Sequence, residues 1–325
     1  MRYRSLGSTG IKVSEISFGT WAIGGSWGNV EEQAALDGLA RAMDQGVTFF
    51  DTADVYGDGR AERLLARATK GRDIAVATKF CRAGDIHDPA TYTYESVSRF
   101  CEGSLKRLER EAIDLYQIHC PPHAVLEQGD VFAVLDRLKR EGKILHYGVS
   151  VETDAEGLTA LRYPGVEALQ VIFNVFRQKP ITELFPVAKE KNAGILVRLP
   201  LASGLLTGKF RKDDSFPADD HRNFNQNGES FNVGETFAGL PFPKGVELAE
   251  RLRWIGDGRG NMTRAALRYI LDYPEVSCVI PGFKNVQQVD DNLATEDVPS
   301  FTAQELAQLS AFYETEVKPW IRGPY

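Results

Sequence analysis

The chain has 325 residues, 43% of them hydrophobic, and its 45 acidic and 38 basic side chains give a net charge of −7. This length allows a large buried core, while the lack of a basic block argues against nucleic acid as a partner. No apolar run reaches the length of about eighteen residues that predicts a membrane span, and the basic first residues lack a secretory apolar core, so we expect a cytoplasmic protein.

Short runs rich in β-branched and apolar residues alternate with helical patterns along the chain. Several of these runs are apolar on both faces, as buried parallel strands are. They predict eight strands, at residues 14–20, 47–53, 73–80, 114–120, 144–151, 168–175, 194–201 and 276–282. Apolar residues at helical spacing predict helices between or after them, at residues 31–45, 61–69, 94–110, 129–141, 154–161, 181–191, 263–271 and 286–294.

This alternation predicts a single (β/α)8 barrel (TIM barrel) domain over residues 1–325, since eight strands that are each followed by a helix are the signature of that fold. A doubly wound parallel sheet is the alternative, but it is expected to carry a G-x-G-x-x-G turn, which the chain lacks. A long irregular loop is predicted at about 210–243 and an extra C-terminal helix at about 302–317. The phenylalanines of the loop favour one that packs onto the domain, often as a lid, over a disordered insertion.

Polar side chains stand at the carboxyl ends of three successive predicted strands. Asp51 lies at the end of the second strand, and Tyr56 follows five residues later. Lys79 lies at the end of the third strand and His119 at the end of the fourth. Each of them alone would most simply be a rim or structural residue. Because barrel enzymes place their chemistry at these strand ends, we expect the four side chains to converge on one rim.

This set of groups suits the reduction of a carbonyl. Addition of a hydride to a carbonyl builds an alkoxide, which needs a proton from a positioned donor. We expect Tyr56 to be that donor, with its pKa lowered from about 10 by the ammonium group of Lys79. Asp51 would keep Lys79 charged and oriented, and His119 would donate a hydrogen bond to the carbonyl oxygen.

A metal-dependent barrel hydrolase is an alternative of another class. It requires several histidine and carboxylate ligands at strand ends, and only His119 qualifies. The cysteines are scattered without pair spacing, so we expect reduced, buried thiols and neither a disulfide framework nor a metal site.

The same residues carry a resemblance to a known family. FDTADVYG around Asp51 and Tyr56, ATK at Lys79 and IH at His119 resemble the catalytic tetrad motifs of the aldo-keto reductases. The likeness extends from RSLGSTGIKVSEISFGT near the start to IPGFKNVQQVDDN near the end, so it covers nearly the whole chain. It implies a (β/α)8 barrel, a nicotinamide cofactor and carbonyl reduction without a metal.

The resemblance also implies where the cofactor binds. The matching positions near the nicotinamide are Gly19, Thr20, Trp21, Asp51, Ser150 and Gln170. A run that resembles the pyrophosphate loop contains Pro200, Leu201, Ser203, Gly204, Leu205 and Lys209. Its glycines free backbone amides to approach phosphate, and its lysine adds charge. The block that resembles the adenosine-binding segment supplies Gly282, Phe283, Lys284, Gln288 and Asn292.

Lys284 matches a cation that pairs with the 2′-phosphate, which favours NADPH and NADP+ over NADH. Two other positions depart from the family pattern. Val151 stands where many members have an asparagine that contacts the carboxamide, and Arg198 stands where many place an aromatic ring against the nicotinamide. A guanidinium group can stack on a flat ring, and its charge would disfavour the oxidised, cationic nicotinamide.

We therefore expect an NADPH-dependent reductase of an aldehyde or ketone, a sugar-like carbonyl among the options, with Tyr56 as the general acid. The small-molecule substrate is expected to contact Trp21, Tyr56, Phe80 and His119, and Trp27 is a further aromatic candidate at the pocket mouth. The alternative is a nucleotide-sensing regulatory subunit of the same fold, like the channel β-subunits that keep much of the site. The oligomeric state is left open.

Overall fold

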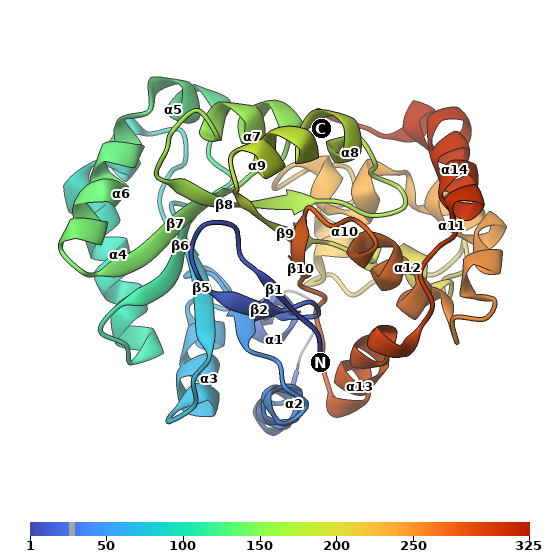
Figure 1. The fold of residues 1–325 in the computed structure, drawn as a ribbon, viewed down its shortest axis with the longest axis horizontal. Coiled ribbons are helices and arrows are strands. Elements are labelled where there is room, and N and C mark those ends of the chain that lie inside the picture. Colours follow the sequence, from blue (N-terminus) through green and yellow to red (C-terminus); the bar gives the residue numbers. More distant parts are fainter. Residues whose placement is uncertain (26–29) are drawn as a thin grey trace.

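A parallel eight-stranded barrel forms the centre of the molecule. The computed structural model describes residues 1–25 and 30–325. The main sheet has the order β3-β4-β5-β6-β7-β8-β9-β10, so each strand pairs in parallel with the next one along the chain (Figure 1). Parallel bridges from Ile16 to Val279 and from Gly19 to Gly282 join the first strand of the sheet to the last. The predicted (β/α)8 fold is confirmed.

Every predicted strand is found within a few residues of its predicted bounds. The barrel strands are β3 (Phe18–Gly19), β4 (Phe49–Asp51), β5 (Ala75–Phe80), β6 (Ile113–His119), β7 (Ile144–Ser150), β8 (Val166–Ile172), β9 (Gly194–Arg198) and β10 (Val276–Val279). The helices between and after them include α1 (Trp21–Gly24), α2 (Glu32–Asp44), α3 (Arg60–Thr69), α4 (Tyr94–Leu108), α5 (His123–Gln128), α6 (Asp130–Arg140), α7 (Asp154–Ala160), α12 (Met262–Leu271) and α13 (Val286–Leu293).

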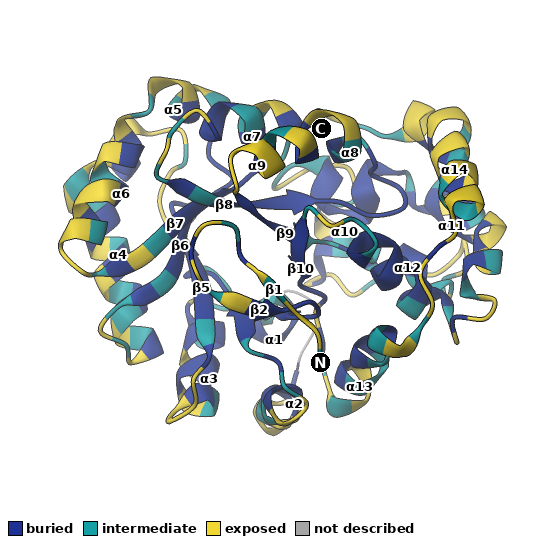
Figure 2. Cartoon of the chain, in the orientation of Figure 1, coloured by how far each residue is buried: buried dark blue, intermediate teal, exposed yellow. Residues whose placement is uncertain are grey.

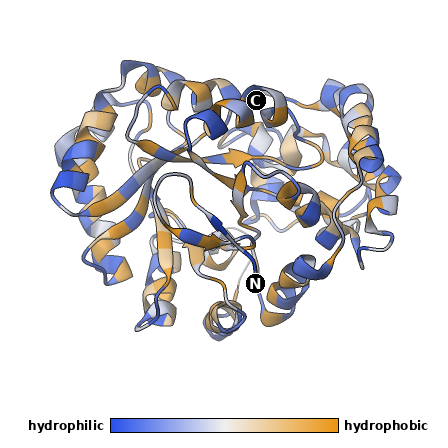
Figure 3. Cartoon of the chain, in the orientation of Figure 1, coloured by the Kyte–Doolittle hydropathy of each residue, from blue (hydrophilic) through white to orange (hydrophobic). Residues whose placement is uncertain are grey.

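Side chains of the strands alternate between two apolar cores. Phe49, Ala77 and Leu196 point into the barrel and belong to its interior cluster. Phe50, directly after Phe49, and Phe80, three residues after Ala77, belong to the larger cluster between the strands and the helices. Because successive side chains of a strand face opposite sides, both faces of each strand are buried. Figures 2 and 3 show the buried strands at the centre and the exposed, more hydrophilic outer faces of the helices.

The sequence pattern does not predict a two-stranded hairpin at the N-terminus, formed by β1 (Tyr3–Ser5) and β2 (Lys12–Ser14). Leu6 and Val13 of this hairpin enter the interior cluster of the barrel. A Cβ added at Gly7 would lie 2.3 Å from the backbone nitrogen of Gly194, so the hairpin turn packs directly on the start of β9. Strands of three residues are too short to show a period-two pattern, which is why sequence analysis misses them.

The long stretch after β9 is packed onto the barrel. It contains the short helix α10 (His221–Phe224). Helix α11 (Phe242–Arg251) begins at the end of the loop predicted at about 210–243. Its phenylalanine rings pack together, with centroids 5.5 Å apart for Phe210 and Phe216 and 5.6 Å apart for Phe216 and Phe237. The stretch is therefore a packed loop, as its phenylalanines predict, and not a disordered insertion.

Two predicted helices differ in detail from the structure. The predicted helix at 181–191 divides into α8 (Pro180–Glu183) and α9 (Phe185–Glu190), because Pro186 suits the first turn of a new helix and not the interior of a longer one. The C-terminal helix α14 (Ala303–Phe312) starts at a Thr302–Glu305 capping box and continues as a π-helical turn to Val317. Among the described helices, none has both the length and the apolar character of a membrane span.

Arg4 connects the N-terminal hairpin to the barrel through hydrogen bonds. Its guanidinium donates hydrogen bonds to the carbonyl oxygens of Leu271 (2.6 Å), Tyr273 (3.0 Å) and Val276 (2.7 Å). It also donates to the carboxylate of Glu15 at 2.7 Å. We predict that Arg4→Ala lowers the free energy of unfolding by about 2–3 kcal/mol, because several acceptors lose their donor at once.

Urea unfolding of this variant is best compared with Arg72→Ala. Arg72 pairs with Asp44 at 2.8 Å, but both side chains are largely exposed. Such surface pairs contribute about 0–1 kcal/mol, so the control should unfold close to wild type. Equal losses in the two variants would show that Arg4 is only another surface arginine.

Candidate active site

A cavity of about 570 Å³ opens at the carboxyl ends of the barrel strands. Small-molecule sites typically have volumes of roughly 300–1,000 Å³. Residues at strand ends, such as His119 and Arg198, form part of its wall, and residues of the long loop, such as Arg222 and Phe231, form another part. The cavity therefore lies where barrel enzymes carry their chemistry.

The four predicted catalytic side chains meet at this cavity. Lys79 forms a buried ion pair with Asp51, and its Nζ lies 3.3 Å from the hydroxyl oxygen of Tyr56. Nζ also donates to the carbonyl oxygen of Thr52 at 2.8 Å. The rings of Tyr56 and His119 meet edge to face, with centroids 5.9 Å apart. Asp51, Tyr56 and His119 line the cavity, whereas Lys79 is fully buried and reaches it only through its partners.

Local structure explains these positions. Asp51 and Lys79 each follow an inward-facing residue by two positions on β4 and β5, so the strand alternation directs them inward as well. Gln170 of β8 donates to the second carboxylate oxygen of Asp51 at 2.6 Å. Tyr56 stands in a turn that requires glycine next to it, because Gly57 has a φ of 62° and an added Cβ would lie 1.9 Å from the carbonyl oxygen of Gly24.

The charges of this group correct one expectation. Burial alone would lower the pKa of Lys79, but Asp51 raises it, so the ammonium group stays charged inside the protein. Burial raises the pKa of Tyr56, and the opposing effect of Lys79 does not overcome it. The predicted lowering of the Tyr56 pKa is therefore wrong for the structure in hand. A protonated Tyr56 at neutral pH is the form that can donate a proton during reduction.

His119 is held neutral. Burial, together with the positive charges of Arg82, Lys79 and Arg198, keeps the pKa of His119 well below its usual value. Within the described residues its Nδ1 has no hydrogen-bond partner. A neutral imidazole has one donor and one acceptor nitrogen, so the side chain can still donate one hydrogen bond.

Most residues predicted to hold the cofactor line the cavity: Gly19, Trp21, Asp51, Gln170, Arg198, Pro200, Leu201, Ser203, Gly204, Lys209, Gly282, Phe283, Lys284 and Gln288. The others, Thr20, Ser150, Leu205 and Asn292, are buried and do not line it. The Thr20 hydroxyl donates to the carbonyl oxygen of Asp51 at 3.0 Å, and the Asn292 amide donates to that of Gly282 at 3.4 Å. These two side chains therefore support the wall in the structure.

The segment from Pro200 to Lys209 has an unusual backbone. Ala202, Ser203 and Gly204 have φ values of 49°, 55° and 101°. A succession of such residues can turn neighbouring N–H groups toward one concave side, which suits an anion. A Cβ added at Gly204 would lie 2.9 Å from the ring of Phe210, so glycine is required at that position.

The segment after β10 is fixed in place by Phe283. Its ring packs edge to face on Phe18, with centroids 5.3 Å apart, and fills the space above Gly38, where an added Cβ would lie 2.4 Å from it. Burial lowers the pKa of Lys284, and the positive charge of Arg222 lowers it further. Lys284 and Arg222 both line this part of the cavity, and Arg222 also pairs with the buried carboxylate of Asp220 at 2.6 Å.

One predicted substrate residue lies elsewhere. Phe80 is fully buried and its ring stacks on Tyr116, with centroids 4.8 Å apart. Because side chains alternate along β5 and Lys79 takes the inward position, Phe80 points away from the cavity into the outer core. Trp21 does line the cavity, and Trp27 lies outside the described residues.

Residues that sequence analysis did not assign lie at the cavity wall near Trp21 or pack on Trp21. The ring of Trp21 packs on His221, at 4.7 Å between centroids, and on Phe231, at 6.1 Å. Arg82 and Glu235 line the same cavity. Arg82 follows β5 by two residues, so the strand-end rule contains a signal for it. Glu235 and His221 lie in the irregular loop, where no periodic pattern marks them.

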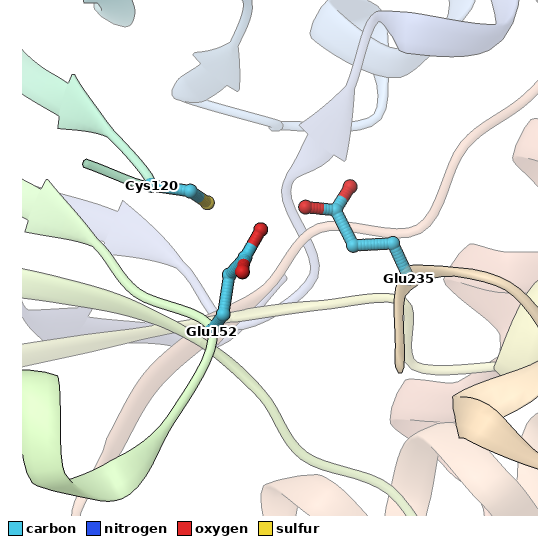
Figure 4. A group of neighbouring side chains, drawn as sticks. All are labelled: Cys120, Glu152 and Glu235. Carbon is cyan, nitrogen blue, oxygen red and sulfur yellow. The ribbon is translucent and has the colours of Figure 1, made fainter. Parts of the chain in front are cut away.

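Four charged side chains, Arg82, Glu152, Arg198 and Glu235, form what we call the charge cluster. Nη2 of Arg82 lies 3.0 Å from Glu152 and 3.1 Å from Glu235, and Nη1 of Arg198 lies 3.6 Å from Glu235. Figure 4 shows Cys120 and the two glutamates, whose possible ligand atoms lie within 4.8 Å of one another. With two guanidinium groups against these carboxylates, the cluster has the chemistry of an internal ion-pair network and does not fit a bound cation.

Similarity to known proteins agrees with this geometry. The model of the Aldo/keto reductase family matches residues 15–314. The chain belongs to the aldo/keto reductase family. Aldo-keto reductase YhdN of Bacillus subtilis (strain 168) is 32% identical to it over 299 residues, which cover 89% of this chain and 87% of that protein.

Two further members extend the comparison. A probable voltage-gated potassium channel subunit beta of Oryza sativa subsp. japonica is 28% identical to this aldo-keto reductase over 336 residues, covering 98% of each chain. The structure of a glycerol dehydrogenase from Gluconobacter oxydans superposes with a TM-score of 0.79 at 26% identity, covering 99% of this chain and 98% of that one. The family supports an oxidoreductase that acts on carbonyl compounds, and the cavity with Asp51, Tyr56 and His119 at its wall and Lys79 behind them fits that chemistry.

We predict that His119 does not titrate in the ordinary range. The structure lowers its pKa because charging the ring would place a cation in a buried site beside three others. NMR of imidazole-labelled protein should show a neutral His119 ring at pH values where an unperturbed imidazole, with a pKa of about 6.5, is already charged. A His119 midpoint at the unperturbed value would contradict the assignment.

Proposed function

We propose that this aldo-keto reductase reduces an aldehyde or ketone with NADPH and uses Tyr56 as the general acid. The observation that carries the proposal is the contact of the Tyr56 hydroxyl with a buried, charged Lys79 at the wall of a cavity large enough for a coenzyme and a small substrate. The reaction adds a hydride to the carbonyl carbon and a proton to its oxygen, so its product is an alcohol.

The residues of the cavity fit a nicotinamide coenzyme with a 2′-phosphate. The left-handed backbone at 202–204 and the adjacent Lys209 suit a pyrophosphate. Lys284, with Arg222 nearby, suits a further phosphate. Gln170 lies on the cavity wall with Tyr56 and can face the ring end. When bound, NADPH supplies the hydride.

The protein's own groups handle the proton and the developing charge. Tyr56 donates its hydroxyl proton to the carbonyl oxygen as that oxygen becomes an alkoxide. Lys79, 3.3 Å away, stabilises the phenolate that is left, and Asp51 keeps Lys79 charged. His119 is neutral and donates a hydrogen bond to the same carbonyl oxygen. In the oxidative direction Tyr56 takes the proton back.

The substrate end suits a small carbonyl compound that also carries hydroxyl groups. Trp21 and Phe231 offer apolar ring faces, while Arg82 and Glu235 offer a hydrogen-bond donor and an acceptor in the same cavity. The similarity to a glycerol dehydrogenase supports a polyol or sugar-like compound of this type.

A regulatory subunit that senses nucleotide is the second candidate, supported by the similarity to a probable potassium channel subunit beta. Turnover separates the two functions. An enzyme reduces a panel of aldehydes, ketones and sugars with NADPH, whereas a pure sensor binds NADPH without consuming it in the presence of any of them.

We predict that Tyr56→Phe lowers kcat by at least about 100-fold, the low end for general acid catalysis, because it removes only the proton donor. NADPH binding, measured by fluorescence titration, should stay near that of wild type. Tyr163→Phe is the matched control, since the Tyr163 hydroxyl donates to the carbonyl of Glu127 on the outer surface. Reductase activity of Tyr56→Phe within a few-fold of wild type would remove Tyr56 from the mechanism.

We predict that Lys284→Ala weakens NADPH binding more than NADH binding, since only NADPH has the 2′-phosphate. One charge-assisted contact is worth about 1.5–3 kcal/mol, or roughly ten- to hundredfold in Kd. Titrations with both coenzymes measure the difference. Lys212→Ala, at an exposed lysine outside the cavity wall, should change neither affinity. Equal losses for both coenzymes in Lys284→Ala would show that Lys284 does not bind that phosphate.

A further inference from the structure

We propose that Glu152 and Glu235 together hold one exchangeable proton, and that this proton is released when the nicotinamide is in its oxidised, cationic form and taken up when it is reduced. The pair thereby sets how strongly the protein discriminates between NADP+ and NADPH at a given pH. The inference rests on the proposed function, because it requires a nicotinamide at the cavity wall near Tyr56.

The geometry brings two carboxylates to one donor. Nη2 of Arg82 lies 3.0 Å from an oxygen of Glu152 and 3.1 Å from an oxygen of Glu235. Oxygens of the two carboxylates lie within 4.8 Å of each other. The side chain of Glu235 is 6% exposed and that of Glu152 is 21% exposed. Two like charges this close and this buried do not ionise independently, so one of them is protonated more readily.

The surroundings decide which carboxyl group holds the proton. Burial raises the pKa of Glu152 to about 7, repulsion by Glu235 adds to this, and Arg82 and Arg198 oppose it. Burial alone would also raise the pKa of Glu235, but the two guanidinium groups outweigh it and hold that pKa below its usual value. Glu152 is therefore the group that changes charge near neutral pH.

The other groups that face the pair do not titrate in this range. The amide of Asn232 donates to Glu152 at 3.0 Å. Burial raises the pKa of Cys120 to about 11, so its thiol stays neutral. With Glu152 protonated, the charge cluster has two positive charges and one negative charge. With Glu152 ionised, the charges balance.

The charge cluster acts directly on the active site. Arg198, Arg82 and Glu235 line the same cavity as Tyr56 and His119. The negative charge of Glu235 contributes to the raised pKa of Tyr56, and the charges of Arg82 and Arg198 contribute to the lowered pKa of His119. A positive ring beside these groups is repelled by a cluster with an excess positive charge. A charge cluster whose charges balance does not repel the positive ring, so binding of the oxidised nicotinamide favours loss of the Glu152 proton to solvent.

The affinity for NADP+ should rise with pH. As pH rises from 6 to 8, Glu152 ionises, the excess positive charge disappears and NADP+ binds more tightly, while binding of the neutral ring of NADPH is affected less. The ratio of Kd for NADP+ to Kd for NADPH should therefore fall, by about three- to tenfold at the effective dielectric of a partly buried site. Titration of the 2′-phosphate is common to both coenzymes and cancels in this ratio.

The test is fluorescence titration of the full-length protein with NADP+ and with NADPH at pH 6, 7 and 8, without substrate. Wild type should show the falling ratio. Glu152→Gln keeps the shape of the side chain but cannot ionise, so the ratio of the two Kd values in this variant should be independent of pH. Glu102→Gln, which removes an exposed carboxylate paired with Lys143, should behave as wild type.

Calorimetry of the wild-type protein in two buffers of different ionisation enthalpy gives a second readout that needs no variant. At pH 7 it should show more proton release for NADP+ than for NADPH. Tight binding of both coenzymes with a pH-independent ratio and equal proton release overturns this inference and leaves the proposed function intact. A falling ratio that persists unchanged in Glu152→Gln also overturns it. Failure to bind either coenzyme overturns the proposed function and the inference together.

Discussion

A charged lysine inside a barrel is the constraint on which the rest of this site depends. Lys79 is fully buried, and an unpaired charge there would be strongly unfavourable. Its Nζ is satisfied by the Asp51 carboxylate, the Thr52 carbonyl and the Tyr56 hydroxyl, so its three N–H groups have three acceptors. Removing one charged partner from a buried ion pair typically costs roughly 3–5 kcal/mol, so the pair of Lys79 and Asp51 also contributes to the stability of the strands that carry it.

The barrel and the loop contribute different parts of the cavity. Asp51, Lys79 and His119 stand on strands and Tyr56 follows one closely, where strand pairing fixes the backbone. Phe231 and Glu235 come from the stretch after β9 and form the part of the wall next to Trp21 and Arg82, and His221 of the same stretch packs on Trp21. The charge cluster joins the two parts, because Glu235 of the loop contacts arginines of the barrel. The two parts of the cavity wall thus share one set of charges.

The strands and the meeting of Asp51, Tyr56, Lys79 and His119 at one rim were predictable because simple periodic rules describe them. Near-continuous apolar runs mark buried strands, and polar residues that interrupt such runs at their ends mark the rim. Phe80 shows the limit of the second rule: it ends the same strand as Lys79, yet the alternation sends it to the opposite face. The direction of the Tyr56 pKa was missed for another reason, since the degree of burial depends on residues far away in sequence.

Glu235 and Glu152 show why the rest of the site could not be predicted. They lie 83 positions apart, and neither stands in a motif that predicts an ion pair. Their relation exists only because the loop folds back onto the rim beside Arg82. The hairpin strands β1 and β2 pose a simpler problem, since three residues carry too little pattern to be recognised.

The phenylalanines of the long loop have a consequence for how this protein can diversify. Phe210 and Phe216 at its entrance meet Phe242 at its exit, with ring centroids 5.7 Å and 5.3 Å apart. The chain therefore leaves the barrel and returns to it at nearly the same place. A segment whose ends are clamped together in this way can change length at a small entropic cost, because loop closure depends only weakly on the number of residues enclosed. Residues 217–236 are thus the part of the cavity wall whose length can change at the smallest entropic cost while the strands keep their spacing.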